Sequence, residues 1–421
     1  IILADDLGYG DVGCYGREDL ETPHTDRMAA EGMRFSDFHS NGSMCSPTRA
    51  ALLTGRYQQR AGIECALSKD EPGLPRDSVT LPQRLAEAGY RSAIFGKWHL
   101  GDRVENNPVH YGFEEFRGHT YGDSDYISHV DRHGDPDWWH NLEKKNEKGY
   151  NTTIFTDHAV RFIEENADRP FFLYLSHSAI HFPWMTPDDG GHRRVGVDYT
   201  EWSPDTDPKF SKLGPHEDVG PVVRRMIEEL DKSVGRVIRA LEANGVDGKT
   251  LVVFASDNGG YLDYGGLHEG DISSNGPLRG QKGDMYEGGH RVPAIVRWPR
   301  HIEGGMETDW ATTTMDLFPT FLELAGLPVD GCYPALDGVS LGPLLCGGRP
   351  PVQRTLFWKM RGRRAARRGS WKLVQNGEAP AELYNLDEDV GESYDLAGRK
   401  TDRVEELSRE LSRWEEELQP R

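Results

Sequence analysis

Oxygen-bearing side chains follow two apolar runs of the sequence, each at the point where a predicted strand ends. Asp5 and Asp6 come directly after the first run, and Asp257 and Asn258 follow a later one. Because ligand sites in open α/β sheets lie at the carboxyl ends of strands, we expect these four side chains to converge. Carboxylate and amide oxygens suit Ca²⁺ or Mg²⁺ rather than zinc. Taken alone, either pair more often caps a turn.

Cys45 stands just before a predicted helix over residues 47–54. Ser46 is a good N-cap, a proline follows at the first helical position, and Gly55 supplies the stop. Backbone N–H groups and the helix dipole at such an end favour an anion, and Arg49 lies within reach of it. A lone cysteine there is more often a small buried hydrophobe, but the spacing Cys-x-Pro-x-Arg is more specific than a lone cysteine.

Two further pairs of polar residues follow predicted strands. Lys97 and His99 lie two residues apart, and side chains two apart in an extended segment point to the same side. His177 and His181 lie four apart, a spacing that invites a metal interpretation. However, the sequence has no His-Glu-x-x-His and already offers an oxygen-based site, so zinc is not expected here and His177 is predicted to be structural.

Short apolar runs alternate with helical stretches through most of the chain. The predicted strands are near-continuously apolar, as expected for strands covered on both faces. The alternation predicts an α/β fold with a large, mostly parallel sheet flanked by helices. The strands are predicted over residues 1–4, 92–95, 171–176, 251–256 and 294–298. The helices are predicted over residues 47–54, 81–88, 154–165, 222–244 and 315–325.

The pattern changes after about residue 340. Short strands follow with little helix between them, and a charged amphipathic helix comes last. This pattern predicts a main domain over residues 1–340 and a small α+β C-terminal domain of antiparallel strands plus a helix over 341–421. The C-terminal strands are predicted over residues 355–360, 371–375 and 382–386, and the helix over 401–418.

Composition and charge exclude several classes of protein. The chain has 421 residues and a formal net charge of −20, which argues against a general nucleic-acid surface. An anionic small substrate remains compatible, because local charge sets a site. The sequence has no apolar stretch near the roughly 18 residues that cross a bilayer, so no transmembrane segment is expected. Five cysteines without a C-x-x-C do not make a disulfide scaffold, although Cys332 and Cys346 could close a short loop.

Several motifs together resemble the type I sulfatases, a formylglycine-dependent family of the alkaline-phosphatase-like superfamily. The segment that begins at Cys45 is similar to the family's first signature, and Gly-Lys-Trp-His-Leu-Gly around Lys97 is similar to its second. The matches run in order over nearly the whole chain, unlike a lone short motif. The matching segments are 3–11, 45–56, 96–101, 256–260, 280–283, 286–289 and 382–386.

The resemblance implies two cofactors. One is formylglycine (3-oxoalanine) formed from Cys45, whose hydrated aldehyde is the nucleophile of the family. The other is a divalent cation, usually calcium, which would neutralise the clustered carboxylates and help the diol to lose a proton. Arg49 would orient the diol with its planar guanidinium. The implied metal ligands are Asp5, Asp6, the modified Cys45, Asp257 and Asn258.

The same resemblance implies roles for four more residues. Lys97 would bind a sulfate oxygen and the diol. His99 would act as base on the second hydroxyl, which expels sulfate and regenerates the aldehyde; alone, it is also a common structural histidine. His181 would bind sulfate and act as acid to the leaving group, and Lys282 would contact the ester oxygen. This local positive cluster would outweigh the global negative charge at contact range.

The implied function is hydrolysis of a sulfate monoester, on a sulfated saccharide or another sulfate ester, after action of a formylglycine maturation enzyme. The chain opens inside an apolar run, so we expect its native start and any export signal to be missing. The resemblance implies an exported protein, periplasmic, extracellular or lysosomal. The alternatives are a phosphatase, phosphodiesterase or phosphonate monoester hydrolase of the same superfamily, and a non-catalytic glycan-binding homologue. Phosphate monoesters often call for two metals, and the sequence offers ligands for one.

Two weaker features have open interpretations. Trp138 and Trp139 lie in an irregular region, 101–149, that carries no motif for the sugar. They form either a sugar-stacking platform or, more commonly, part of the packing. A basic run either contacts a polyanionic glycan or, more commonly, lies on a solvated strand edge. The run consists of Arg361, Arg363, Arg364, Arg367 and Arg368.

Overall fold

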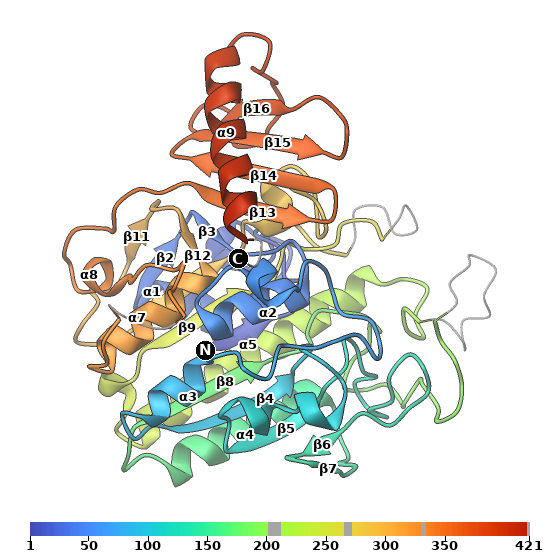
Figure 1. Cartoon of the computed structure of the whole chain (residues 1–421). Coiled ribbons are helices and arrows are strands. Elements are labelled where there is room, and N and C mark those ends of the chain that lie inside the picture. The colour runs from blue at the N-terminus through green and yellow to red at the C-terminus, as the bar shows by residue number, and fades with distance from the viewer. Residues whose placement is uncertain (201–211, 265–271, 330–333, 419–421) are drawn as a thin grey trace.

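The structure is a computed structural model that describes residues 1–200, 212–264, 272–329 and 334–418. A large ten-stranded sheet forms the body of the molecule, and a separate four-stranded sheet stands at one end of it (Figure 1). Cys332, a possible partner for Cys346, lies outside the described residues. None of the described helices combines the length and the apolar character that a membrane crossing needs.

The large sheet has the strand order β11-β2-β10-β9-β1-β8-β4-β5-β6-β7. Its five central strands, from β9 to β5, are parallel, which confirms the predicted fold class. Antiparallel strands flank this centre on both sides, because β10 runs against β9 and β6 runs against β5. The bounds are β1 Ile2–Ala4, β2 Met33–Phe35, β4 Arg91–Lys97, β5 Glu115–His119, β6 Trp139–His140, β7 Glu143–Lys144, β8 Phe171–Ser176, β9 Val252–Ser256, β10 Ala294–Arg297 and β11 Met306–Thr308. A short pair is formed by β3 Phe38–His39 and β12 Thr312–Thr313.

Helices cover both faces of this sheet, so its central strands are apolar on both sides. On β1, Ile2 and Ala4 pack with α4 and α5 in one core, while Leu3 packs with α2, α3 and α7 in the other. This explains why the strands are continuous apolar runs in the sequence. The helices are α1 Pro23–Ala30, α2 Cys45–Thr54, α3 Leu81–Ala86, α4 Asn151–Glu165, α5 Gly220–Ala243, α6 Glu287–His290, α7 Leu317–Leu324, α8 Gly342–Leu345 and α9 Thr401–Leu418.

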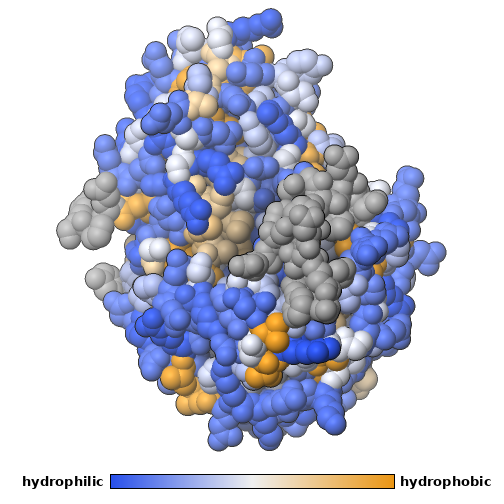
Figure 2. Space-filling view, turned by 90° about the vertical axis from the view of Figure 1, so that its right-hand side faces the viewer, coloured by the Kyte–Doolittle hydropathy of each residue, from blue (hydrophilic) through white to orange (hydrophobic). Residues whose placement is uncertain are grey.

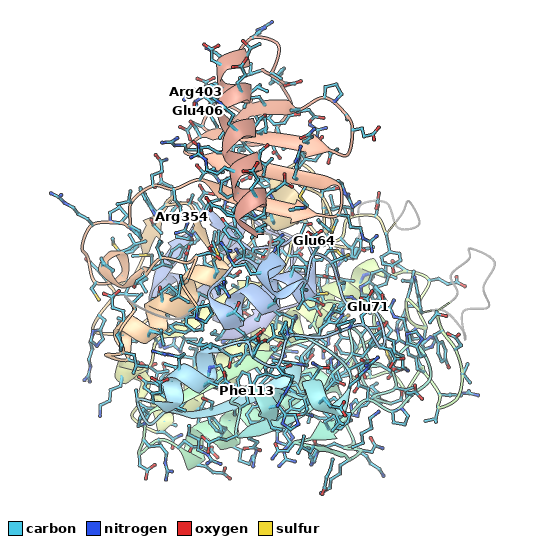
Figure 3. All side chains as sticks on the ribbon, viewed as in Figure 1. Glu64, Glu71, Phe113, Arg354, Arg403 and Glu406 are labelled. Carbon is cyan, nitrogen blue, oxygen red and sulfur yellow. The ribbon has the colours of Figure 1, made fainter. Side chains whose placement is uncertain are left out.

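The small sheet is antiparallel and carries α9 on one face. Leu407, Leu411 and Trp414 of α9 recur at helical spacing and pack on the sheet. Arg354, labelled in Figure 3, lies just before the first strand and donates to Asp316 at 2.6 Å, which ties the connecting segment to the main body. The strands are β13 Leu356–Met360, β14 Arg363–Arg368, β15 Trp371–Asn376 and β16 Glu382–Asn385.

The basic run does not lie on a solvated strand edge. All of its arginines except Arg361 lie on β14, between β13 and β15, and these pair with carboxylates of the same chain. Arg367 pairs with Asp37 of the main body, and Arg368 pairs with Glu410 of α9. Trp138 and Trp139 are buried, 2% and 6% exposed, so packing rather than an open sugar platform explains them.

Candidate active site

Four of the five predicted metal ligands, the strand-end side chains, meet at the carboxyl ends of β1 and β9. The two strands pair in parallel with their last residues opposite each other, so the side chains that follow them lie together. The backbone N–H of Asp6 donates to Oδ1 of Asp257 at 3.3 Å, and Nδ2 of Asn258 donates to Oδ1 of Asp6 at 2.9 Å. The described part of the loop that follows β8 extends to the right of Figure 1, and Figure 2 looks onto this mostly hydrophilic side.

Two oxygen atoms in this group are buried without a hydrogen-bond donor among the described residues: Oδ1 of Asp5 and Oδ1 of Asn258. A buried acceptor without a partner is costly, so both atoms suit a bound cation. Ligand atoms of Asp5, Asp6 and His181 also lie within 4.8 Å of one another. Burial raises the pKa of Asp5, and a cation would hold its carboxylate ionised. The donor set fits Ca²⁺ or Mg²⁺.

Each carboxylate in this group forms its shortest ion pair with a different buried cation. The pairs are Lys97 with Asp5 at 2.5 Å, Lys282 with Asp6 at 2.5 Å and Arg49 with Asp257 at 2.7 Å. Burial would lower the pKa of Lys282, but Asp6 raises it well above its usual value. Since three carboxylates face three cations, a divalent ion would leave excess positive charge that an anionic ester can neutralise.

Cys45 is the first residue of α2, and its side chain lies within the protein. The prediction that Ser46 caps the helix was wrong, because Met44 has the extended backbone of an N-cap, with φ −143° and ψ 159°. Oγ of Ser46 accepts instead from the backbone N–H of Leu67 at 3.0 Å. Gly55 ends the helix in the left-handed region, at φ 66°, as predicted.

His99 lies beyond the end of β4, and its backbone is left-handed, with φ 54°. This local backbone conformation, rather than the alternation of side chains along a strand with Lys97, directs its ring to Cys45. Its Nε2 donates to the carbonyl of Leu67 at 3.0 Å. Nδ1 therefore carries the lone pair, 3.1 Å from Sγ of Cys45. Burial, and next the charge of Lys97, lower the pKa of His99 well below its usual value, so the ring is neutral.

His181 and His177 have different surroundings. Nδ1 of His181 donates to the carbonyl of Phe182 at 2.7 Å, and its Nε2 faces Oδ2 of Asp6 at 3.9 Å. Burial, and next the nearby ammonium groups, lower the pKa of His181 well below its usual value. His177 contacts Oγ of Ser233 on α5 at 2.9 Å, as expected for a structural residue.

Two residues that support the site were not assigned from the sequence. Asp11 accepts from the backbone N–H groups of Gly8 and Ser274, both at 2.7 Å, and so fixes the loop after β1. Ser176 accepts from Nη1 of Arg49 at 2.5 Å. Ser176 is the last residue of β8, so the strand-end argument that found the acidic residues could have found it too.

A second group of possible metal ligands, His39, Glu287 and His290, lies between the two sheets. The two histidines contact each other through their Nδ1 atoms at 3.0 Å, and Lys372 donates to Oε1 of Glu287 at 2.9 Å. Because the two histidines already bond to each other and Glu287 already bonds to Lys372, we interpret the group as a buried ion-pair network.

The sequence matches the family model described as Sulfatase over residues 1–327, and the model described as N-sulphoglucosamine sulphohydrolase, C-terminal, over residues 281–419. Arylsulfatase A of Homo sapiens is 33% identical over 457 residues, covering 94% of this chain and 83% of its own length. N-acetylgalactosamine-6-sulfatase of Sus scrofa is 35% identical over 396 residues, covering 88% and 70%. The crystal structure of Ps i-CgsB in complex with k-i-k-neocarrahexaose has a TM-score of 0.85 and 30% identity, covering 99% of this chain and 92% of that one.

Proposed function

Because this chain belongs to the sulfatase family of sulfuric ester hydrolases, we propose that it removes sulfate from a saccharide, using a formylglycine at position 45 and a bound divalent cation. Support for a saccharide comes from two similar proteins. One is named for N-acetylgalactosamine, and the other was solved with a neocarrahexaose.

The contact between His99 and Cys45 carries the proposal. A neutral imidazole with its lone pair 3.1 Å from the side-chain atom at position 45 is placed to take a proton from a hydroxyl there. The hydrated formylglycine would supply two such hydroxyls, one as nucleophile and one whose deprotonation returns the aldehyde. Arg49, one turn further along α2, would orient them.

The charged side chains would bind the ester. A cation held by the four strand-end side chains would acidify the hydroxyl and add positive charge. Lys97 and Lys282 would donate to sulfate oxygens. Burial, and next the ammonium charges, lower the pKa of His181, and an anionic ester beside it would offset those charges, so that its Nε2 can carry a proton to the leaving oxygen.

The test uses protein whose modification at position 45 has been established by mass spectrometry after co-expression with a maturation enzyme. We expect it to release sulfate from sulfated oligosaccharides with higher kcat/KM than phosphate from matched phosphate esters. Higher specificity for phosphate would overturn the substrate class. The Cys45→Ala variant is the control, and full activity in that variant would overturn the nucleophile.

Removal of the metal tests the second part of the proposal. Dialysis against a chelator should abolish turnover, and added Ca²⁺ or Mg²⁺ should restore it. Unchanged turnover after chelation would overturn the metal site. Export belongs to the same proposal by family resemblance, and fractionation of the source cells would test it.

A further inference from the structure

Arg132 and Arg193 form a cationic cluster around Asp123. This cluster lies beside the proposed sulfate site, on loops outside the family motifs. We propose that Arg132 binds a second anionic group of the substrate, a carboxylate or a further sulfate, next to the ester that is cleaved. The inference rests on the proposed function and deepens it, because such a subsite selects polyanionic saccharides over singly sulfated ones.

Two guanidinium groups in this cluster share one carboxylate. Asp123 accepts from Nε of Arg132 at 2.8 Å and from Nη2 of Arg193 at 2.7 Å. Burial would raise the pKa of Asp123, but the two arginines lower it below its usual value, so the carboxylate is ionised. Within the described part of the chain, neither arginine is ion-paired with a second carboxylate, so one positive charge is left uncompensated.

Arg132 is the end of the cluster that reaches solvent. Its side chain is 24% exposed, whereas the side chains of Asp123 and Arg193 are fully buried. Its Nε is bound to Asp123, but Nη1 and Nη2 form no hydrogen bond with any residue for which the structure gives a placement. The planar fork of two terminal N–H₂ groups is the arrangement with which arginine binds carboxylates and other oxyanions.

Aromatic rings connect this guanidinium to both histidines of the site. Its central carbon lies 5.2 Å from the ring centroid of Phe182 and 5.8 Å from that of Tyr121. Phe182 directly follows His181, and the ring of Tyr121 lies 6.2 Å from that of His99. A substituent on the sugar that carries the cleaved ester is therefore within reach of Arg132.

The loop around Arg132 is held in place by its own hydrogen bonds. The carbonyl of Arg132 accepts from the backbone N–H of Tyr199 at 2.7 Å. Oδ1 of Asp131 accepts from the backbone N–H groups of His133 at 2.8 Å and Asp135 at 2.9 Å. A donor fixed in this way loses little conformational freedom when an anion binds.

The test compares wild type with Arg132→Gln and Arg132→Lys, each matured at position 45 and loaded with Ca²⁺. Arg354→Gln is the matched control, because the side chain of Arg354 is 23% exposed and its partner Asp316 is fully buried. Three versions of one oligosaccharide serve as substrates: one sulfate alone, one sulfate with a carboxylate, and two sulfates. The readout is the ratio of kcat/KM for each dianionic version to that for the singly sulfated version.

We expect Arg132→Gln to lower this ratio about tenfold or more for at least one of the two dianionic saccharides, which is the value of a charge-assisted hydrogen bond. Arg132→Lys should retain part of the ratio. The saccharide whose ratio falls identifies the bound group as a carboxylate or a second sulfate. An unchanged ratio for both dianionic saccharides, or an equal fall of the ratio in Arg354→Gln, would overturn the proposal.

Binding by calorimetry separates this inference from the proposed function. The same saccharides are titrated into Cys45→Ala protein with and without Arg132→Gln. One outcome is that wild type releases no sulfate while Arg132→Gln abolishes the binding preference for the dianionic saccharide. That result would contradict the proposed function and support the anion subsite. If the preference is absent or survives the substitution, the subsite falls, whatever the turnover shows.

Discussion

Arg367 and Asp37 form a buried bidentate ion pair across 330 positions of the chain, with Nη1 2.7 Å from Oδ1 and Nη2 2.5 Å from Oδ2. Asp37 follows β2 of the large sheet and Arg367 lies on β14 of the small one, so the pair joins the two sheets. His39 contacts Oδ1 of Asp37 through Nε2 at 2.7 Å and His290 through Nδ1 at 3.0 Å. Burial lowers the pKa of both histidines, so the network is held by neutral rings between charged ends.

Replacement of Arg367 by methionine should destabilise the protein strongly. The change would leave Asp37 buried with only the more distant guanidinium of Arg291, at 3.6 Å, and we expect a loss of about 3–5 kcal/mol in the free energy of unfolding. Arg368→Met is the neighbouring control, since Arg368 is 53% exposed and its pair with Glu410 should contribute less than about 1 kcal/mol. Urea unfolding measures both, and equal losses would contradict the interpretation of the network.

Replacement of Glu392 by glutamine should change how stability depends on pH. Burial raises the pKa of Glu392 from 4.5 to about 7, although Lys372 lies 2.9 Å away. The folded protein therefore binds more protons than the unfolded chain between these values, so this residue's contribution to stability falls as pH rises through that window.

Glu392→Gln removes that contribution. The free energy of unfolding of wild type minus that of the variant should decrease from about pH 4.5 to about pH 7 and be level above. Urea unfolding at half-unit steps of pH measures this difference. A difference that stays constant with pH would refute the assignment.

Replacement of His99 by asparagine should impair turnover without unfolding the protein. Asparagine tolerates the left-handed backbone at this position but supplies no base, so kcat should fall about 10²–10⁴-fold. His177→Asn is the contrasting variant, expected to lower the melting temperature with little change in kcat. A His99 variant with wild-type kcat would rule out its role as base.

The thiols of the unmodified protein should differ in reactivity. Cys346 is exposed, whereas Cys45 is 1% exposed and burial raises the pKa of its thiol. Iodoacetamide should therefore label Cys346 in the native protein but label Cys45 only in urea. Peptide mass spectrometry reads out both sites, and equal rates in the native state would show that the site opens readily.

The central fold followed from the sequence because β1, β4, β8 and β9 are apolar on both faces. Elements with mixed composition were missed. The strand β14 reads Arg-Arg-Ala-Ala-Arg-Arg, and its arginines find carboxylates that lie far away in the chain, such as Asp37. Local composition carries no information about such partners, so the run was interpreted as an edge.

The candidate site was predictable wherever a residue ends a strand or belongs to a motif. Asp5 and Asp257 met both conditions, and they lie together as expected. The position of His99 was not predictable from alternation, because a left-handed residue redirects the chain. Arg132 was missed because it lies in a loop without a motif, and its partner Asp123 becomes significant only when the loops are folded together.

The place of β1 between β8 and β9 has a consequence for biosynthesis. The strand that carries Asp5 leaves the ribosome well before one of its two neighbours, which ends at Ser256. At about 5–20 residues per second, position 45 of the nascent chain waits roughly ten to forty seconds before the pocket can close over it. If a maturation enzyme acts on position 45, as we propose, translation itself provides an interval in which it can reach this side chain.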